Sequence, residues 1–406
     1  MTAFDRPWIE ASLAALERGA VDLIERAELE RKLARAAKER RGLRVKFGMD
    51  PSSPDLHVGH GIPLRRLREL QDLGHTVVLI VGDATAMVGD PSGRNKLRPQ
   101  LTRQEVEKNL VTYREQAGIV LDLARTELRH NTEWFDRMSF EEVLRLCGRM
   151  TVAQMLQRDT FQERIKADQP IGIHEFLYPL MQGWDSVMVR ADVELGGTDQ
   201  LFNLLVGRDL QESAGQERQV ICTGPLINGL DGRKMSKSYG NAIGMTDAPA
   251  DMFGKVMSMP DGDMALWFEQ LTRLAPEEVA ALLAGHPRAA KARLAQELTA
   301  FYHGAAAAAD AARAFDRLFK DKAVPEDVPE VRFGADWPAQ GVPLAVLLRE
   351  VGLAESGSKA RQAIEQGGVR VAGEIVRDAQ ALIPPPPDGQ GLLVQVGKRR
   401  FARVRR

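Results

Sequence analysis

The chain has 406 residues, of which 44% are hydrophobic, and its 55 lysines and arginines are balanced by 56 aspartates and glutamates. This length exceeds one ordinary hydrophobic core, so we expect two or three domains, and the composition excludes an intrinsically disordered chain. Two cysteines, Cys147 and Cys222, exclude a disulfide scaffold and a cysteine-rich metal cluster, and they fit a reducing compartment.

The predicted elements begin with a charged helical pattern over residues 8–41, which is followed by a strand at 44–49. A turn-rich loop leads into a helix from about 60 to 73 and then into a β-branched strand at 76–81. Strand, loop, helix and strand in this order form a βαβ unit. Open α/β sheets bind ligands beyond the carboxyl ends of their strands, so we expect the loop after the first strand to contribute to a site.

Helices and short strands alternate further along the chain. Helical patterns cover about 103–117, 140–165, 174–190 and 199–214, and strand candidates lie at 126–130, 191–195 and 219–223. Residues 246–320 are rich in alanine, leucine, glutamate and arginine without a strand signal, so they predict a helical domain. We therefore predict an α/β protein with a Rossmann-like parallel-sheet catalytic domain at 1–245, a helical domain at 246–335 and a small α+β module at 341–406.

The sequence indicates no targeting or membrane-spanning segment. Acidic residues are scattered through the first 20 positions, which lack the apolar core of a signal peptide. The longest apolar runs, such as 77–81, are far shorter than the roughly 20 residues that a transmembrane helix needs. We therefore expect a soluble cytoplasmic protein.

The charge is unevenly distributed along the chain. Residues 341–406 contain eleven lysines and arginines against six acidic residues, although the whole chain has a net charge of −1. A basic module on an acidic body suggests a polyanionic partner. The alternative is a solvated basic tail with no partner.

A first short motif, His57-Val58-Gly59-His60, lies where the loop turns into a helix. Two imidazoles three residues apart can face a phosphate together, and the helix N-terminus adds its N–H groups and its dipole. The alternatives are a pair of surface or capping histidines, or a metal pair. Metal is the weakest of these, because no nearby cysteine or third histidine completes a zinc site.

A second motif is formed by residues 234–238, with the sequence Lys-Met-Ser-Lys-Ser, and glycines flank it on both sides. Glycines permit a loop that moves, and two ammonium groups can follow the charge of a departing pyrophosphate. Alone, the motif is better explained as a solvated basic turn. Both motifs, in this order within an α/β pattern, favour a phosphate-handling site for adenylate chemistry.

These motifs resemble the HIGH and KMSKS signatures of class I aminoacyl-tRNA synthetases. Further segments resemble the bacterial tyrosyl-tRNA synthetases of the longer-chain branch, namely 48–51 (Gly-Met-Asp-Pro), 89–93 (Gly-Asp-Pro-Ser-Gly), 178–185 and 196–200 (Gly-Gly-Thr-Asp-Gln). The resemblance covers about 44–240. It continues more loosely into 341–406, which is similar to an S4-type RNA-binding domain.

The resemblance implies a tyrosine-binding set. Tyr178, Gln182 and Asp90 would hold the α-ammonium group, Asp185 would accept a hydrogen bond from the phenolic hydroxyl, and Gln200 would bind the carboxylate or the adenylate. Spacing alone puts Tyr178, Gln182 and Asp185 on one helix face. Without the flanking motifs, that face would be interpreted as core with one satisfied aspartate.

The resemblance also implies the residues for ATP and for RNA. The catalytic set would be His57, His60, Lys234 and Lys237. The ATP-binding set would be Asp50, Ser52, Gly59, Gly196, Asp199, Lys237 and Ser238. Mg²⁺ would accompany ATP without a protein-bound metal.

The RNA-binding candidates are Lys359, Arg361, Arg370, Lys398, Arg399 and Arg400. The partners would be tRNA(Tyr), L-tyrosine and ATP, the helical domain would lie on the anticodon side, and a homodimer is expected because relatives form one.

One position departs from the family pattern. Better-known relatives have a tyrosine two residues before the glycine equivalent to Gly48, where it is a second partner of the substrate hydroxyl. Here that position is Lys46. Specificity would then rest more on Asp185, or on another residue. Three rival functions stay open at this point: a tryptophanyl-tRNA synthetase, a small-molecule nucleotidyltransferase and a non-catalytic RNA-binding paralogue.

Overall fold

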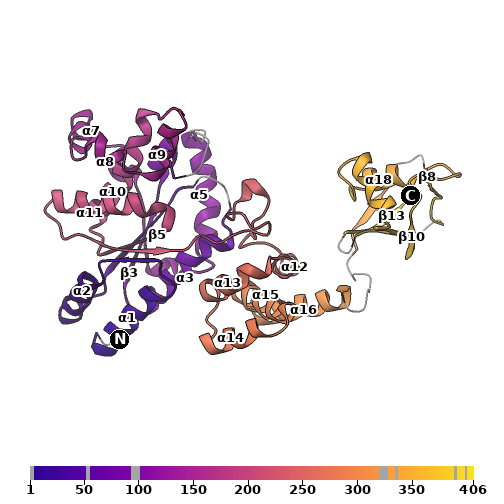
Figure 1. Ribbon diagram of the computed structural model, residues 1–406, viewed down its shortest axis with the longest axis horizontal. Coiled ribbons are helices and arrows are strands. Elements are labelled where there is room, and N and C mark those ends of the chain that lie inside the picture. The colour runs from indigo at the N-terminus through magenta and orange to yellow at the C-terminus, as the bar shows by residue number, and fades with distance from the viewer. Residues whose placement is uncertain are drawn as a thin grey trace. The chain divides into compact units, whose positions relative to one another are not determined.

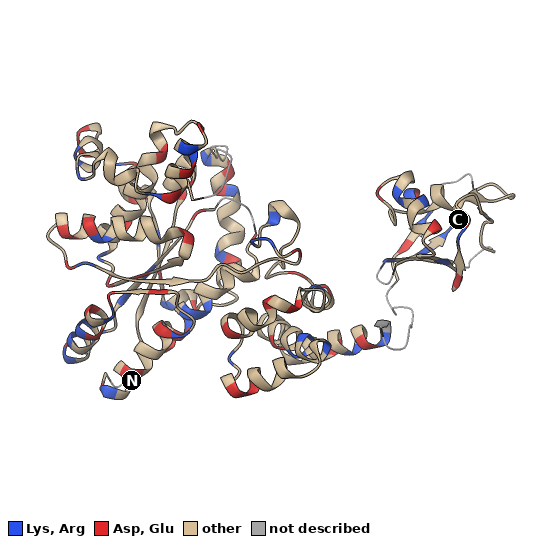
Figure 2. Ribbon diagram, in the orientation of Figure 1, with Lys and Arg blue, Asp and Glu red and all other residues tan. Residues whose placement is uncertain are grey.

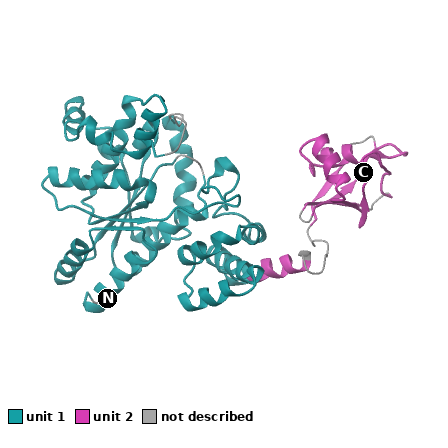
Figure 3. Cartoon of the chain, viewed as in Figure 1, with its two compact units in different colours: residues 1–308 teal, residues 309–406 magenta. Residues whose placement is uncertain are grey.

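The computed structural model in Figure 1 describes residues 4–51, 55–92, 101–319, 328–333, 337–387, 391–397 and 400–406. The chain divides into two compact units, residues 1–308 and 309–406, which Figure 3 colours separately. Each unit has a hydrophobic core of its own, so each is described by itself.

Among the residues that the structure describes, the first unit is built on a six-stranded sheet with the strand order β1-β6-β5-β2-β3-β4. All neighbouring pairs are parallel except β1 with β6 at one edge. The strands are β1 (Asp22–Ile24), β2 (Arg44–Met49), β3 (Thr76–Val81), β4 (Thr126–His130), β5 (Val193–Gly197) and β6 (Val220–Gly224). β3 is buried almost throughout, because helices cover both faces of a parallel sheet.

Alternate residues of the central strands face two different helical layers. Val45 and Phe47 join the main core, which the helices α1, α2, α3 and α5 complete. Val78 and Ile80 face the opposite layer and pack beside Val189 of α10. Ligand-binding loops therefore lie at one end of a sheet that is covered on both sides.

The helices of the first unit follow the predicted order, with differences at their ends. They are α1 (Arg6–Glu17), α2 (Arg26–Glu39), α3 (Val58–Asp72), α4 (Asp83–Val88), α5 (Arg103–Ala117), α6 (Thr132–Phe135), α7 (Phe140–Cys147), α8 (Val152–Met155), α9 (Asp159–Lys166), α10 (Leu177–Val189), α11 (Leu201–Ser213), α12 (Pro249–Met257), α13 (Met264–Leu271), α14 (Pro276–Ala284) and α15 (Pro287–His303). α16 (Ala305–Phe319) contains the division between the units.

The second unit combines two short helices with small sheets. β10 (Glu374–Val376), β9 (Val369–Val371), β12 (Leu392–Val396), β13 (Arg400–Arg405) and β7 (Glu330–Arg332) form one sheet in that order, and β11 (Leu382–Ile383) pairs with β8 (Val342–Pro343). The helices α17 (Leu344–Glu350) and α18 (Gly357–Glu365) contribute Leu344, Leu348 and Ile364 to its core. The predicted small α+β module is confirmed as a fold.

The predicted fold class is confirmed, and three strands have the predicted bounds, at 44–49, 76–81 and 126–130. The predicted helix over 140–165 is instead the three short helices α7, α8 and α9. β1 interrupts the helical pattern of 8–41, and it was missed because three residues become a strand only by pairing with β6. The boundaries at 245 and 335 stay a prediction.

Candidate active site

The first signature lies at the N-terminus of α3, beyond the carboxyl end of β2. The backbone N–H of His57 donates to Nδ1 of His60 at 3.2 Å, and the two ring centroids are 3.9 Å apart at an interplanar angle of 36°. Gly59 permits this close arrangement, because a Cβ there would lie 3.0 Å from the His57 ring. Both imidazoles therefore occupy the positive end of one helix.

Both histidines are neutral at physiological pH. Burial, with smaller contributions from His60 and the lysines of the second signature, lowers the pKa of His57 to about 2. Burial, followed by Lys237 and Lys234, lowers the pKa of His60 to about 4. Neutral imidazoles can still donate N–H hydrogen bonds to an anion.

The segment after the second signature closes on the first. The N–H of Val58 donates to the carbonyl of Ile243 at 2.9 Å, and His57 forms an antiparallel bridge with Gly244. Met235 is buried, and it anchors the signature by donating its N–H to the carbonyl of Ile227 at 3.0 Å. The structure thus brings together two motifs that are far apart in the sequence.

The two signature lysines each contact an acidic side chain of the same site. Nζ of Lys234 lies 2.8 Å from Oδ2 of Asp199, and Nζ of Lys237 lies 2.6 Å from Oδ2 of Asp55. Both lysines are substantially exposed, and Ser238 is exposed beside Lys237. Such solvated ion pairs are worth about 0–1 kcal/mol, so a polyphosphate can replace them.

Two glycines at the end of β5 shape the loop that holds Asp199. A Cβ on Gly197 would lie 2.7 Å from Oδ1 of Asp199, and one on Gly196 would lie 2.9 Å from Leu204. A larger residue at either position would displace its neighbours. The two glycines therefore allow Asp199 to fold back over the strand end.

Asp50 joins β2 to the predicted tyrosine-binding helix. Its Oδ2 accepts a hydrogen bond from the Tyr178 hydroxyl at 2.8 Å, and its Oδ1 accepts one from Thr85 at 2.7 Å. Burial and the charge of Asp50 raise the pKa of Tyr178 well above its usual value. Tyr178 is therefore a neutral donor at all physiological pH values.

A chain of amide and carboxylate groups links the remaining amino-acid-binding candidates. Nε2 of Gln200 donates to Asp90 at 3.0 Å. Nδ2 of Asn203 donates to Oε1 of Gln200 at 3.0 Å and to Oε1 of Gln182 at 2.8 Å. Buried Arg158 donates to Oδ1 of Asn203 at 2.6 Å and lies 3.8 Å from Asp90. These contacts fix Asp90, Gln200 and Gln182 in one cluster.

Asp185 is buried on the same face of α10 as Tyr178 and Gln182. Nε1 of Trp134 donates to its Oδ1 at 3.0 Å, and Nδ2 of Asn131 donates to its Oδ2 at 3.4 Å. Burial raises the pKa of Asp185 to about 7, although Lys46 acts in the opposite direction. Each carboxylate oxygen has capacity for one more donor.

Four residues of these clusters, Asn131, Trp134, Arg158 and Asn203, were not among the predicted site residues. Asn131 directly follows β4 and Trp134 lies in the next element, α6, so their place beyond a strand end was the available signal. Nothing in the local sequence marks Arg158, which directly precedes α9, or Asn203 of α11 as a site residue. Their role becomes visible only when α11 packs against α10 and Arg158 bonds to Asn203.

The remaining predicted residues fall into two groups. Ser52, Lys398 and Arg399 are outside the described residues. In the second unit, Lys359 and Arg361 are on α18, Arg370 is on β9 and Arg400 is on β13; all four are exposed, and Figure 2 shows the basic residues of this unit.

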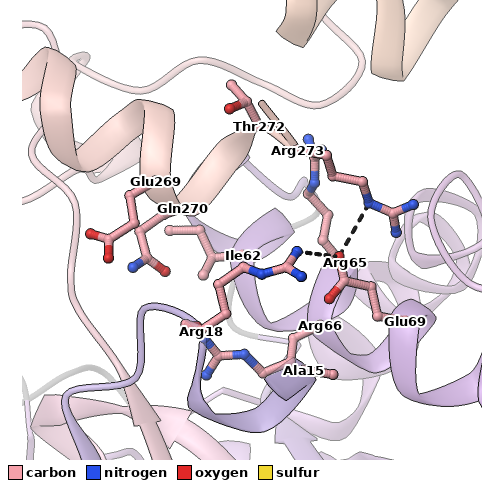
Figure 4. Close-up of a pocket in the computed structure, with 10 residues that line it drawn as sticks. All are labelled: Ala15, Arg18, Ile62, Arg65, Arg66, Glu69, Glu269, Gln270, Thr272 and Arg273. Carbon is pink, nitrogen blue, oxygen red and sulfur yellow. Dashed lines mark hydrogen bonds and ion pairs between the residues drawn. The ribbon is translucent and has the colours of Figure 1, made fainter. Parts of the chain in front are cut away.

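A separate cavity lies between α1, α3 and α13, and Figure 4 shows its lining, which includes Arg18, Arg65, Arg66 and Arg273. Glu69 of α3 accepts ion pairs from Arg18 at 3.4 Å and from Arg273 at 3.2 Å. No predicted site residue lines this cavity. Its charged groups connect α3, the helix of the first signature, to the helices that follow the sheet.

Within the described ranges, no group of three or more histidine, cysteine or acidic side chains is arranged to hold a metal ion. In the same part of the chain, no helix has the length and apolar character needed to cross a membrane.

Comparison with known proteins shows which family has this sequence. Residues 38–320 match the family model "tRNA synthetases class I (W and Y)", and residues 342–385 match the S4 domain. A tyrosine–tRNA ligase of Bordetella pertussis is 50% identical, with 98% of this chain and 97% of that protein covered. The chain belongs to the tyrosine–tRNA ligase family. A Thermotoga maritima member is 49% identical, with 97% of both chains covered.

Solved structures of tyrosyl-tRNA synthetases share the fold of this chain. A mitochondrial tyrosyl-tRNA synthetase of Aspergillus nidulans matches with a TM-score of 0.63 at 24% identity, over 77% of this chain and 99% of that one. A tyrosyl-tRNA synthetase of Archaeoglobus fulgidus, solved with L-tyrosine, matches with a TM-score of 0.60 at 22% identity, over 75% and 99%. The full-length sequence relatives do not favour the tryptophanyl or nucleotidyltransferase alternatives.

Proposed function

We propose that the chain attaches tyrosine to tRNA(Tyr) in two steps. The tyrosine carboxylate attacks the α-phosphate of ATP, which forms tyrosyl-adenylate and releases pyrophosphate. A hydroxyl of the terminal adenosine of tRNA then takes the tyrosyl group and releases AMP. The observation that carries this proposal is the closure of the segment after the second signature on the first. Asp50, directly after β2, accepts a hydrogen bond from Tyr178 of α10.

The first step requires positioning and charge stabilisation. A carboxylate is already a nucleophile, so no general base is needed. His57 and His60 would donate N–H hydrogen bonds to the phosphates without adding charge, since both are neutral. Lys234 and Lys237 would leave their weak surface ion pairs and neutralise the departing pyrophosphate.

The nucleotide and the amino acid would occupy neighbouring subsites. Asp199 would bind the ribose hydroxyls once Lys234 turns to phosphate, and Asp50 and Gly59 would line the phosphate side. Mg²⁺ would enter with the ATP phosphates, because it keeps its water shell and is usually held by substrate oxygens. The amino acid would lie against the cluster of Asp90, Gln182 and Gln200.

Asp185 would distinguish tyrosine from phenylalanine. A buried carboxylate with acceptor capacity left can bind the phenolic hydroxyl, whereas phenylalanine would leave that capacity unused in a dry site. Rejection of phenylalanine through the missing hydroxyl is already the known behaviour of tyrosyl-tRNA synthetases as a class. The burial of Asp185 supplies a physical reason for the same behaviour in this chain.

The other parts of the chain would serve tRNA and assembly. Residues 246–335 would form the anticodon-side domain, and the basic module at 341–406 would bind tRNA in the cytoplasm. Three apolar residues, Phe140 and Leu144 of α7 and Val152 of α8, are 77%, 55% and 63% exposed. An apolar surface of this kind would fit the interface of a homodimer.

The proposal is tested by amino-acid-dependent exchange of labelled pyrophosphate into ATP. We expect exchange with tyrosine and exchange at least about 100-fold weaker in kcat/KM with phenylalanine or tryptophan, because only the phenol matches the Asp185 site. Preferred exchange with tryptophan would contradict the tyrosine assignment. Absence of exchange with all three would support a non-catalytic paralogue.

A further inference from the structure

Lys46, at the position where better-known relatives have tyrosine, lies in the middle of β2 and is fully buried. Its Nζ donates to the carbonyl of Gln182, to Oγ of Ser186 and to Oε1 of Glu194, each at 2.8 Å. An ammonium group has three protons, and these three acceptors use them all. Lys46 therefore has no donor left for the hydroxyl of a bound substrate.

The acceptors of Lys46 belong to a closed network. Glu194 of β5 is the direct neighbour of Lys46 across the parallel β2–β5 pair. Its Oε2 accepts hydrogen bonds from Oγ of Ser186 at 2.9 Å and from Nε2 of Gln219. All three protons of Lys46 and both oxygens of Glu194 have partners in this network. Such a buried charge pair resists rearrangement, since removal of either member leaves the other unpaired in a dry environment.

The network holds the turn of α10 that carries the specificity residues. Gln182 and Ser186 lie on either side of Asp185 in the sequence of α10. Lys46 thus connects this turn to the two central strands of the sheet. That connection ties the helical turn around Asp185 to the sheet, while Trp134 and Asn131 contact its carboxylate directly.

We propose that Lys46 is a positioning residue for tyrosine selection, which holds α10 through Gln182 and Ser186 and keeps Asp185 a charged hydrogen-bond acceptor. The inference rests on the proposed function and deepens it. The positive charge of Lys46 favours the ionised form of Asp185, whereas the negative charge of Glu194 disfavours it. Where better-known relatives have a tyrosine hydroxyl, this chain has a buried ion pair that leaves no free donor on Lys46.

The surroundings of Asp185 make this effect measurable. Burial raises its pKa to about 7, so small changes of nearby charge alter its ionised fraction near neutral pH. Because the pKa is raised, the carboxylate is present above about pH 7 and is lost below it. The groups that face it from the surrounding elements are Lys46, Glu194, Tyr178, Asn131 and Trp134.

The test compares Lys46→Met and Glu194→Gln in full-length enzyme, by tyrosine-dependent pyrophosphate exchange between about pH 6 and 9. The KM for tyrosine should change with pH around a midpoint that reports the ionisation of Asp185. In Lys46→Met this midpoint should rise by about one pH unit. The KM near pH 7 should therefore increase about fivefold and recover at high pH. In Glu194→Gln the same midpoint should fall. The preference for tyrosine over phenylalanine should drop in Lys46→Met, and the KM for ATP should stay unchanged.

Lys32→Met is the matched control, because Lys32 of α2 is also buried and charge-paired, 3.6 Å from Asp192 and 3.7 Å from Glu217. It should lower the melting temperature but leave the midpoint unchanged. If Lys46→Met does not fold, the downward shift in Glu194→Gln carries the test. The proposal would be overturned if the midpoints of Lys46→Met and Glu194→Gln both equalled that of the unmodified enzyme, or if both moved in the same direction. Loss of tyrosine-dependent exchange in the unmodified enzyme would refute the proposed function instead.

Discussion

Among the single residues of the site, few carry positive charge before the phosphates arrive. His57 and His60 are neutral because burial disfavours the charged imidazolium form and so lowers the pKa of both side chains. On the phosphate side of the site, the positive charge is carried by Lys234 and Lys237, which are exposed and weakly paired. This separates a rigid pair of neutral donors from a pair of adjustable cations.

We predict that His60→Ala and Lys237→Ala each slow adenylate formation at least about tenfold, since each removes a hydrogen bond or charge that acts on the transferring phosphate. Single-turnover measurements with excess enzyme would give this rate. Tyrosine affinity, measured by titration, should stay within about twofold. Lys291→Ala in α15, whose lysine pairs with Asp261, is the control and should leave the rate unchanged. An unaltered first-step rate in both site variants would contradict the assigned roles.

Among the elements, α10 and α11 must approach closely for the site to form. α10 carries Gln182 and Asp185, while α11 carries Asn203, which bonds to Gln182. The helices meet at Gly183, where a Cβ would lie 3.0 Å from the backbone nitrogen of Gly207. Backbone atoms cannot move aside as the end of a flexible side chain can.

We predict that Gly183→Ala destabilises the enzyme by about 1–3 kcal/mol through overpacking and raises the KM for tyrosine, because α11 must move away from Gln182. Thermal unfolding and exchange kinetics would measure the two effects. Gly254→Ala in α12 is the matched control, since its Cβ would meet no atom within 4 Å. That variant should be neutral or more stable by up to about 1 kcal/mol. An unchanged KM in Gly183→Ala would show that the contact does not set the subsite.

Across the molecule as a whole, chemistry and RNA binding are assigned to different units. The predicted catalytic and amino-acid residues that the structure describes lie in residues 1–308, and the basic RNA-binding candidates lie in 309–406. Electrostatic contacts to phosphates dominate the affinity of such modules and weaken as salt increases. Damage to the second unit should therefore affect the second step alone.

We predict that the double variant Arg361→Glu/Arg370→Glu lowers kcat/KM for tRNA charging at least about tenfold at low salt, with a smaller loss at high salt. Pyrophosphate exchange should be unaffected, because both residues belong to the second unit and the adenylate site belongs to the first. Arg6→Glu, at an exposed position of α1, serves as the charge-reversal control. Normal charging by the double variant would remove these two arginines from the RNA-binding set.

The fold was largely predictable because local patterns and sheet pairing agree. The parallel strands β2 and β3 are rich in apolar residues and largely buried, so their bounds were predicted correctly. The short strand β1 was missed because a three-residue strand depends on its partner in space. The helix break at 147–152 was missed although Gly148 and the capping box of Thr151 and Gln154 are local signals. Of the site, the signatures and the spacing on α10 were predictable, whereas Arg158 and Asn203 were not.

The order of the residues was enough to indicate the chemistry, because the motifs at 57–60 and 234–238 and the polar face of α10 are short, local and specific in their residue types. How those groups are tuned depends on the folded arrangement. Burial makes the histidines neutral and brings the pKa of Asp185 to about 7, and the register of β2 with β5 places Lys46 beside Glu194. Desolvation and cross-strand pairing arise from the packing of segments that are distant in the chain, so neither can be inferred from local sequence patterns.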